Sequence, residues 1–247
     1  MVSFEASQLF IVTGASSGIG EGTALLLNSL GATVVGIGRD ADRLAALKLN
    51  SAAPDRLFVE SCDLAASIDS LPEFARTLRE KYGKFAGLAY CAGVSLVEPL
   101  RGYRHSHATE LFAINYFAPI ALAQAVLDKR NCVGAGTALV FVASLAGVTP
   151  DKGQCAYAGS KAALIASARV IAREYASAGA RVNTISPADI DTPMTQRLAN
   201  SREERAHLYP FGFGKVSDAA NLIAFLLSDR AGWITGENYT LDGGLKG

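Results

Sequence analysis

The chain has 247 residues, half of them hydrophobic, and its 23 Lys plus Arg balance its 23 Asp plus Glu to a formal net charge of zero. This length suits one large domain or two small ones, and the balanced charge provides no field that would draw the chain to nucleic acid or to a membrane surface. The start of the chain lacks the basic residues and apolar core of a signal peptide, and no apolar run approaches a membrane span. We therefore expect a cytoplasmic protein whose partner is a small molecule.

Short apolar runs alternate with helical segments along the whole chain. The apolar, β-prone runs predict strands, in chain order, at about 9–12, 33–37, 56–60, 88–91, 137–143, 181–185 and 238–241. Helices are predicted between them, at about 23–30, from 40, from 70, 106–129, 156–176 and 217–227. Continuously apolar strands separated by helices favour a parallel sheet that is covered on both faces.

Single residues mark where some of these helices begin or bend. Ser217 suits a helix N-terminus, and Ser70 with Glu73 predicts a capping box. Pro119 lies inside the long fourth helix, where it removes a backbone hydrogen bond and predicts a kink. Asn115 lies one helical turn before Pro119, beside the missing backbone hydrogen bond.

These patterns predict one α/β domain over residues 1–247, with a doubly wound, mainly parallel sheet of about seven strands. Ligands are expected outside the carboxyl ends of the strands. Residues 188–214 combine prolines and charges with little periodicity, which predicts a mobile cover over that site.

Cysteine and histidine usage indicates neither disulfides nor a metal. The cysteines lack C-x-x-C spacing, so reduced, mostly buried thiols are expected at Cys62, Cys91, Cys132 and Cys155. His105 and His107 have no Cys or carboxylate cluster at ligand spacing, so no metal site is predicted there.

A glycine-rich segment follows the first predicted strand and precedes a helix, with its glycines spaced G-x-x-x-G-x-G. Glycine permits the tight turn and the close approach of the backbone to a ligand, and the helix start offers free N–H groups to a pyrophosphate. This context predicts a dinucleotide site formed by Gly14, Ser16, Ser17, Gly18, Ile19 and Gly20.

The second predicted strand ends in Gly38-Arg39. A carboxylate at this point would accept from the ribose hydroxyls of NAD, whereas a basic residue would bind the 2′-phosphate of NADP. Arg39 therefore predicts a preference for NADP. The next residue, Asp40, carries a carboxylate, so NAD remains possible as the cofactor. This carboxylate also suits a helix N-terminus.

Tyr157 and Lys161 are four residues apart in a predicted helix, so their side chains share one face. A nearby cation favours the ionised form of a phenol, which makes the pair a candidate acid/base catalyst. An isolated Y-x-x-x-K more often places a packed tyrosine beside a solvated lysine, so the rest of the chain must decide.

The chain resembles a short-chain dehydrogenase/reductase of the compact, single-domain branch over essentially its whole length. The matching positions are, in order, the glycine motif, Asp63, Ala92-Gly93, Asn115, Ser144, Tyr157 with Lys161, and residues 187–192. The resemblance implies a Rossmann-like fold. It also implies an NAD(P)(H)-dependent oxidoreductase that interconverts a carbonyl and a secondary alcohol by hydride transfer.

The resemblance also implies individual roles. Tyr157 is the proton donor, Lys161 lowers the pKa of Tyr157 and binds the nicotinamide ribose, and Ser144 holds the substrate oxygen. Asn115 helps to maintain the helix distortion and a water that leads protons towards Lys161. The further expected cofactor contacts are Gly38, Arg39, Asp63 at the adenine, Leu64, Ala92, Gly93, Pro187, Ile190 and Thr192 at the carboxamide. The expected substrate contacts are Ser144, Gln154, Tyr157 and Ala188.

Two departures from the family pattern put the substrate in doubt. Tyr90-Cys91 stands where many members have two asparagines, and Ala188 follows Pro187 where glycine is usual. The C-terminal stretch from Phe213 resembles the 3-oxoacyl-acyl-carrier-protein reductase group, but many alcohol, sugar and polyol dehydrogenases share this ending. An acyl-carrier partner usually calls for a basic patch. Its candidate residues, diluted by Glu203 and Glu204, are Arg101, Arg104, Arg197, Arg202 and Arg205.

Two other protein classes are alternatives to a carbonyl reductase. Sugar-nucleotide epimerases also use Tyr-x-x-x-Lys, but they have a different glycine spacing and a longer C-terminal domain. A non-catalytic cofactor-sensing protein on the same fold would have lost the acid/base residues, which are present here. Alanine-rich faces on the helices from Ser106 and Ala156 could pack across a two-fold axis or inside the core. The family resemblance favours a homotetramer, with a homodimer as the alternative.

Overall fold

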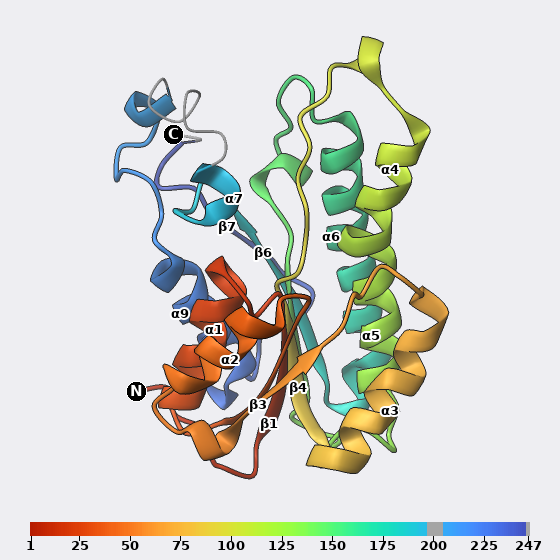
Figure 1. The fold of residues 1–247 in the computed structure, drawn as a ribbon, viewed down its shortest axis with the longest axis vertical. Helices are drawn as coiled ribbons and strands as arrows, with labels where there is room; N and C mark the ends of the chain where they lie inside the picture. Colours follow the sequence, from red (N-terminus) through yellow and green to blue (C-terminus); the bar gives the residue numbers. More distant parts are fainter. Residues whose placement is uncertain (197–204, 246–247) are drawn as a thin grey trace.

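The computed structural model describes residues 1–196 and 205–245. Its centre is a seven-stranded sheet in the order β3-β2-β1-β4-β5-β6-β7, in which all neighbours are parallel (Figure 1). The strands are β1 Leu9–Thr13, β2 Thr33–Gly38, β3 Leu57–Ser61, β4 Phe85–Tyr90, β5 Ala138–Val142, β6 Arg181–Pro187 and β7 Asn238–Leu241. The predicted α/β, doubly wound sheet is confirmed, and the predicted strand bounds agree to within three residues.

Helices cover both faces of the sheet (Figure 1). One face is covered by α1 Gly18–Ser29, α2 Ala41–Leu49 and α9 Val216–Leu227. The other is covered by α3 Leu71–Tyr82, α4 His105–Phe112, α5 Ala118–Leu127 and α6 Cys155–Tyr175. Each layer has its own apolar core, because parallel strands between two helical layers bury both of their faces. The order of the strands reverses between β1 and β4, which opens a crevice at their carboxyl ends.

The long fourth helix is interrupted where a kink was predicted. Residues Ala113–Phe117 form a π-helical turn between α4 and α5, and Pro119 lies in the first turn of α5. The proline has no N–H to donate, so the helix passes this point with a wider turn. The combined segment His105–Leu127 is long and apolar enough to cross a membrane by length and composition, but half of its most apolar window is buried inside the protein.

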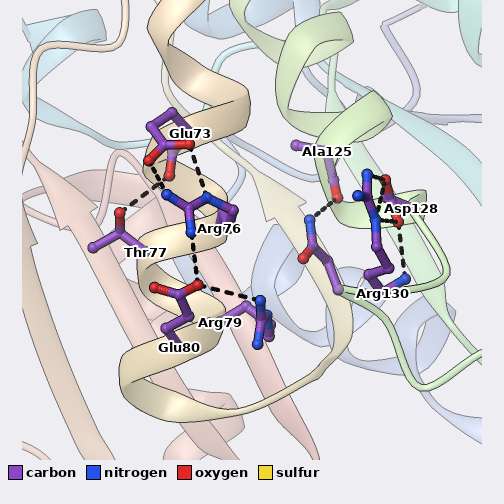
Figure 2. A network of polar contacts seen from close by, with 9 residues as sticks. Glu73, Arg76, Thr77, Arg79, Glu80, Ala125, Asp128 and Arg130 are labelled. Atoms are coloured by element: carbon purple, nitrogen blue, oxygen red, sulfur yellow. Dashed lines mark hydrogen bonds and ion pairs between the residues drawn. The ribbon is translucent and has the colours of Figure 1, made fainter.

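Asp40 forms a cap as predicted. Ser70 occupies the N-cap position of α3 as predicted, but its capping box with Glu73 is wrong, and so is the predicted cap at Ser217. Ser70 Oγ donates to the Ser67 carbonyl, and the Glu73 carboxylate accepts from Arg76 one turn later (Figure 2). The ion pair along α3 therefore replaces the capping box. The N-cap of α9 is Lys215 rather than Ser217.

The cap of α9 uses a carboxylate further along the helix. Asp218 accepts from the Lys215 N–H at 2.7 Å, so Ser217 falls within the first turn.

The cysteines are all free thiols, but their burial is more varied than expected. Cys132 is buried, Cys62 and Cys91 are half-buried, and Cys155 is exposed because it begins α6. His107 lies in α4 and contacts Glu98 through Nδ1 at 3.1 Å.

Candidate active site

A cavity of about 1380 Å³ runs along the carboxyl edge of the sheet. This volume exceeds that of an ordinary small-molecule pocket, so it has room for a dinucleotide together with a small substrate. The expected site residues that line it are Gly14, Ser16, Ser17, Gly18, Ile19, Gly20, Gly38, Arg39, Asp63, Leu64, Ala92, Gly93, Ser144, Gln154, Tyr157, Lys161, Pro187, Ala188, Ile190 and Thr192. Asn115 lies directly behind the wall of the cavity.

The glycine turn connects β1 to α1 in a conformation that other residues could not adopt without strain. Gly14 and Gly18 have φ of +66° and +58°. A Cβ at Gly14 would lie 2.9 Å from the Ala92 nitrogen, and one at Gly20 would overlap the Gly14 carbonyl. The turn therefore brings backbone close to backbone at the floor of the cavity.

The N-terminus of α1 faces this turn. Within the described residues, the Ser17 side chain makes no capping hydrogen bond, although Ser17 is the N-cap. The first N–H groups of the helix and its positive dipole end thus remain available to an anion. The local geometry fits the pyrophosphate of a dinucleotide.

The end of β2 supports one side of the expected ribose site. A Cβ at Gly38 would lie 3.1 Å from Ser16 Oγ, so the two residues are in close contact. Arg39 is exposed and lines the cavity. Asp40 accepts from the Arg43 N–H at 3.0 Å and pairs with Arg43 Nε at 3.2 Å, so its carboxylate is engaged by α2.

Asp63 and Thr192 are the residues expected at the adenine and at the carboxamide of the cofactor. Asp63 Oδ1 accepts from the Ala65 N–H at 3.0 Å, which is the turn-capping interaction that such a residue often makes. Thr192 is buried and receives support from Thr195 Oγ1, which accepts from the Thr192 N–H at 3.1 Å. Both residues also line the cavity.

Asn115 is fully buried in the π-helical turn. Its Oδ1 accepts from the Val94 N–H at 3.0 Å, and its Nδ2 donates to the Val94 carbonyl at 3.0 Å and to Ser160 Oγ at 3.1 Å. The widened turn thus orients an amide that ties the loop after β4 to α6. Gly93 fits beside this amide, since a Cβ there would lie 3.0 Å from Asn115 Oδ1 and 3.3 Å from Lys161 Nζ.

Lys161 is almost fully buried in α6, with 4% of its surface exposed. Its Nζ donates to the Val142 carbonyl at the end of β5, at 2.9 Å. Burial lowers the pKa of Lys161 to about 8, because the charged form loses its water.

Tyr157 and Ser144 lie next to each other in the wall of the cavity. Ser144 Oγ accepts from the Ala146 N–H at 3.2 Å, which orients this hydroxyl at the end of β5. Burial raises the pKa of Tyr157, interaction with the Ser144 hydroxyl opposes this, and the charge of Asp189 adds to it. This direction is opposite to the expected lowering by Lys161, because the loss of water around the phenol has the largest effect.

The structure also places residues in the cavity wall that sequence reasoning missed. Asp189 follows Ala188 at the end of β6, and Tyr209 lies in the later part of the expected cover, 188–214. Arg205 was considered only as part of a basic surface patch, but it pairs with Asp189 at 3.3 Å. The position of Asp189 directly after the Pro187-Ala188 pair was the available signal. Residues 197–204 of the predicted cover, including Arg197 and Arg202, lie outside the described residues.

Comparisons with known proteins show which family model and relatives the chain is similar to. A family model described as enoyl-(acyl carrier protein) reductase matches residues 14–246. A 3-oxoacyl-acyl-carrier-protein reductase of Thermotoga maritima is 31% identical over 242 residues, covering 95% of this chain and 96% of the relative. An NAD-dependent glycerol dehydrogenase of Listeria innocua is 33% identical over 239 residues, covering 95% of this chain and 92% of the relative.

Solved structures match the whole fold. A short-chain dehydrogenase/reductase of Brucella melitensis, described as a glucose/ribitol dehydrogenase, superposes with a TM-score of 0.91 at 29% identity, covering 99% of this chain and 98% of that chain. A short-chain dehydrogenase of Burkholderia cenocepacia in complex with NADP has a TM-score of 0.90 at 28% identity, covering 97% and 98% of the two chains.

Proposed function

Because the chain belongs to the short-chain dehydrogenase/reductase family, we propose that Tyr157 is the acid/base of its reaction and that Ser144, Lys161 and Asn115 complete the catalytic set. The protein is an NAD(P)-dependent oxidoreductase that acts on CH–OH donors and interconverts a carbonyl and a secondary alcohol. The observation that carries the proposal is the shared cavity. The glycine turn of β1 and the hydroxyls of Ser144 and Tyr157 line the same space.

The proposed roles follow from the contacts. The nicotinamide cofactor supplies or accepts the hydride when bound. Ser144 and Tyr157 hold the substrate oxygen, and Tyr157 donates its proton to the alkoxide that develops there. The raised pKa of Tyr157 suits this donor role in reduction, because the phenol keeps its proton at neutral pH.

Lys161 and Asn115 act behind the substrate. The Lys161 ammonium is held at the Val142 carbonyl and lies close to the cavity floor beside Gly93, where it would bind the nicotinamide ribose. Asn115 holds Val94 and Ser160 in place. We retain the expected proton path through a water at Asn115 as part of the proposal.

We propose NADP as the preferred cofactor. Arg39 lines the expected ribose end of the cavity, and the neighbouring carboxylate of Asp40 is engaged by Arg43. This arrangement leaves a cation rather than a carboxylate to meet the ribose 2′ position. A comparison of kcat/KM for NADPH and NADH tests the preference, and a clear preference for NADH would contradict it.

The substrate is proposed to be a small carbonyl compound or alcohol. Reduction of a 3-oxoacyl chain on acyl carrier protein is the second candidate, because curated relatives named for that reaction match nearly the whole chain. A panel of ketones, aldehydes, alcohols and a 3-oxoacyl thioester, assayed with both cofactors, distinguishes these candidates. Cofactor binding without any turnover would instead favour the cofactor-sensing alternative.

We further propose that residues 1–247 form one domain, that residues 188–214 cover the site, and that the protein is cytoplasmic and assembles as a homotetramer or homodimer. Apolar side chains on α6 and the turn before α5 support the assembly, since Phe117 and Val170 are 48% and 54% exposed. Light scattering of the purified protein tests the oligomeric state.

A further inference from the structure

A carboxylate, a guanidinium and a phenol form a cluster in the wall of the cavity next to Ala188. Tyr209 Oη donates to Asp189 Oδ2 at 2.9 Å, and Arg205 Nη1 pairs with the same oxygen at 3.3 Å. Arg205 Nη2 also donates to Tyr209 Oη at 3.4 Å. The two donors restrict the position of the carboxylate.

The backbone around this cluster is also held in place. The Asp189 carbonyl accepts from the Gly214 N–H at 3.0 Å, and a bridge joins Ile190 to Gly214. Tyr209 is only 5% exposed, and its ring packs 4.9 Å from the ring of Phe213. Asp189 is thus a fixed feature of the wall, with 22% of its side chain exposed.

The cluster lines the same cavity as Ser144 and Tyr157. The charge of Asp189 is near enough to raise the pKa of Tyr157, after the larger effect of burial. Among the described residues, the wall of the whole cavity also carries other charged side chains, namely Arg39, Asp63, Glu110, Asp151, Lys152 and Lys161. The substrate therefore meets charged side chains of both signs, set among the apolar residues of the wall.

Such a wall discriminates between substrates by desolvation. An apolar acyl chain placed against Asp189 and Arg205 would remove their water without replacing its hydrogen bonds, which is costly for charged groups. A substrate hydroxyl can donate to the carboxylate and accept from the guanidinium, so it replaces the lost water.

We infer that Asp189 is a specificity-determining residue that, with Arg205 and Tyr209, selects small ketones bearing a hydroxyl group over plain ketones and 3-oxoacyl thioesters. In the reverse direction the selected substrates are the corresponding diols. The inference rests on the proposed function, because it requires a carbonyl held between Ser144 and Tyr157 while the hydroxyl reaches Asp189.

The test compares ketones that differ by one hydroxyl in place of a methyl group. Hydroxyacetone is matched with butanone, and 4-hydroxybutan-2-one with pentan-2-one, which covers two distances between the carbonyl and the hydroxyl. Acetoacetyl-N-acetylcysteamine serves as the acyl thioester. For at least one pair, the ratio of kcat/KM should favour the hydroxylated ketone by roughly tenfold to hundredfold, the range of a hydrogen bond to a charged group.

Asp189→Asn should reduce that ratio by a similar factor, mainly through a higher KM for the hydroxylated ketone, while butanone and NADPH binding change little. Tyr209→Phe removes one hydroxyl and should shift the ratio in the same direction if Asp189→Asn does not fold. Glu60→Gln is a matched control, since Glu60 Oε1 accepts from Tyr82 Oη at 2.6 Å and from Lys81 Nζ at 2.7 Å outside the cavity wall. This control should leave the ratio unchanged.

The outcomes separate the inference from the function on which it rests. Equal kcat/KM within both pairs, or a ratio that Asp189→Asn and Tyr209→Phe leave intact, would overturn the inference alone. Absence of turnover with every ketone and thioester and both cofactors would overturn the proposed function and this inference with it.

Discussion

The Asn115 side chain holds the backbone of Val94 from both sides, accepting from its N–H and donating to its carbonyl at 3.0 Å each. This pairing links the π-helical turn to the loop that forms the cavity wall after β4. The distorted helix is therefore tied to the cavity wall, which supports the proposed role of Asn115 and agrees with the tendency of π-turns to occur at functional sites.

Replacing Asn115 should affect stability and activity together. Asn115→Leu leaves the N–H and carbonyl of Val94 and the Ser160 hydroxyl without their amide partner, so we expect a loss of roughly 3 kcal/mol in the free energy of unfolding and a lower kcat. Denaturant titration and steady-state assays measure the two effects.

Asn131→Leu is the matched control, because Asn131 is also buried and its Nδ2 donates to the Ala125 carbonyl at 2.8 Å, far from the cavity wall. It should lower stability while the activity of the folded protein is retained. If Asn115→Leu retained kcat as fully as Asn131→Leu, the proposed link between the Asn115 hydrogen bonds and activity would be disproved.

Lys161 predicts a specific dependence of stability on pH. Its pKa is about 8 in the folded protein, below the ordinary 10.5, so the unfolded chain binds more protons between these values. Stability should therefore rise with pH across this window, by about 3 kcal/mol at most, because the buried ammonium loses its charge.

Lys161→Met lacks this contribution. The free energy of unfolding of the unsubstituted protein minus that of Lys161→Met should thus increase from pH 8 to pH 10.5 and stay constant below that window. Denaturant titrations at several pH values measure the difference. If the free energies of unfolding of the two proteins changed in parallel with pH, the lowered pKa of Lys161 in the folded protein would be contradicted.

Arg181 has a structural role that is separate from the site. Its buried guanidinium donates to the carbonyls of Leu226 at 2.7 Å and Ser228 at 2.8 Å, where α9 ends. Arg181→Met should cost roughly 3 kcal/mol, because buried carbonyls lose a charged donor, and the remaining folded protein should keep its kcat. Arg230→Met, at an exposed arginine, should change the midpoint of unfolding little. An equally small effect at both positions would show that the buried contacts contribute nothing.

Arg39 carries the prediction of cofactor preference. Arg39→Asp should lower the ratio of kcat/KM for NADPH over NADH by at least roughly tenfold, because a carboxylate repels the 2′-phosphate and accepts from the ribose hydroxyls of NADH. Arg76→Gln, on the outer face of α3, serves as the control. A ratio that is the same in both variants would exclude Arg39 as the determinant.

The sequence was most informative where the local pattern decides the outcome. Apolar runs between helices predicted the parallel sheet, because strands buried on both faces have no polar alternation. The glycine turn was predictable since only glycine tolerates the φ of Gly14 and Gly18. The kink before Pro119 followed from the missing N–H, although its π-helical form did not.

The sequence was least informative where distant segments meet. Ser70 and Ser217 have suitable spacing for caps, but competing partners in the folded chain decide the hydrogen bonds. The pKa of Tyr157 depends on burial and on Asp189, which are properties of the assembled cavity. The Asp189, Arg205 and Tyr209 cluster joins a strand end to a segment with little periodicity, so spacing alone could not reveal it.

The most direct test of the account is the Tyr157→Phe variant, assayed for carbonyl reduction and, by fluorescence titration, for NADPH binding. We predict that turnover falls by at least roughly a hundredfold, because no proton is donated to the developing alkoxide, while NADPH binding is largely retained. Tyr116→Phe is the matched control, since Tyr116 Oη contacts Ser167 Oγ at 3.2 Å outside the cavity wall, and it should leave kcat unchanged. Undiminished turnover in Tyr157→Phe would contradict the central claim that this phenol is the acid/base of the reaction.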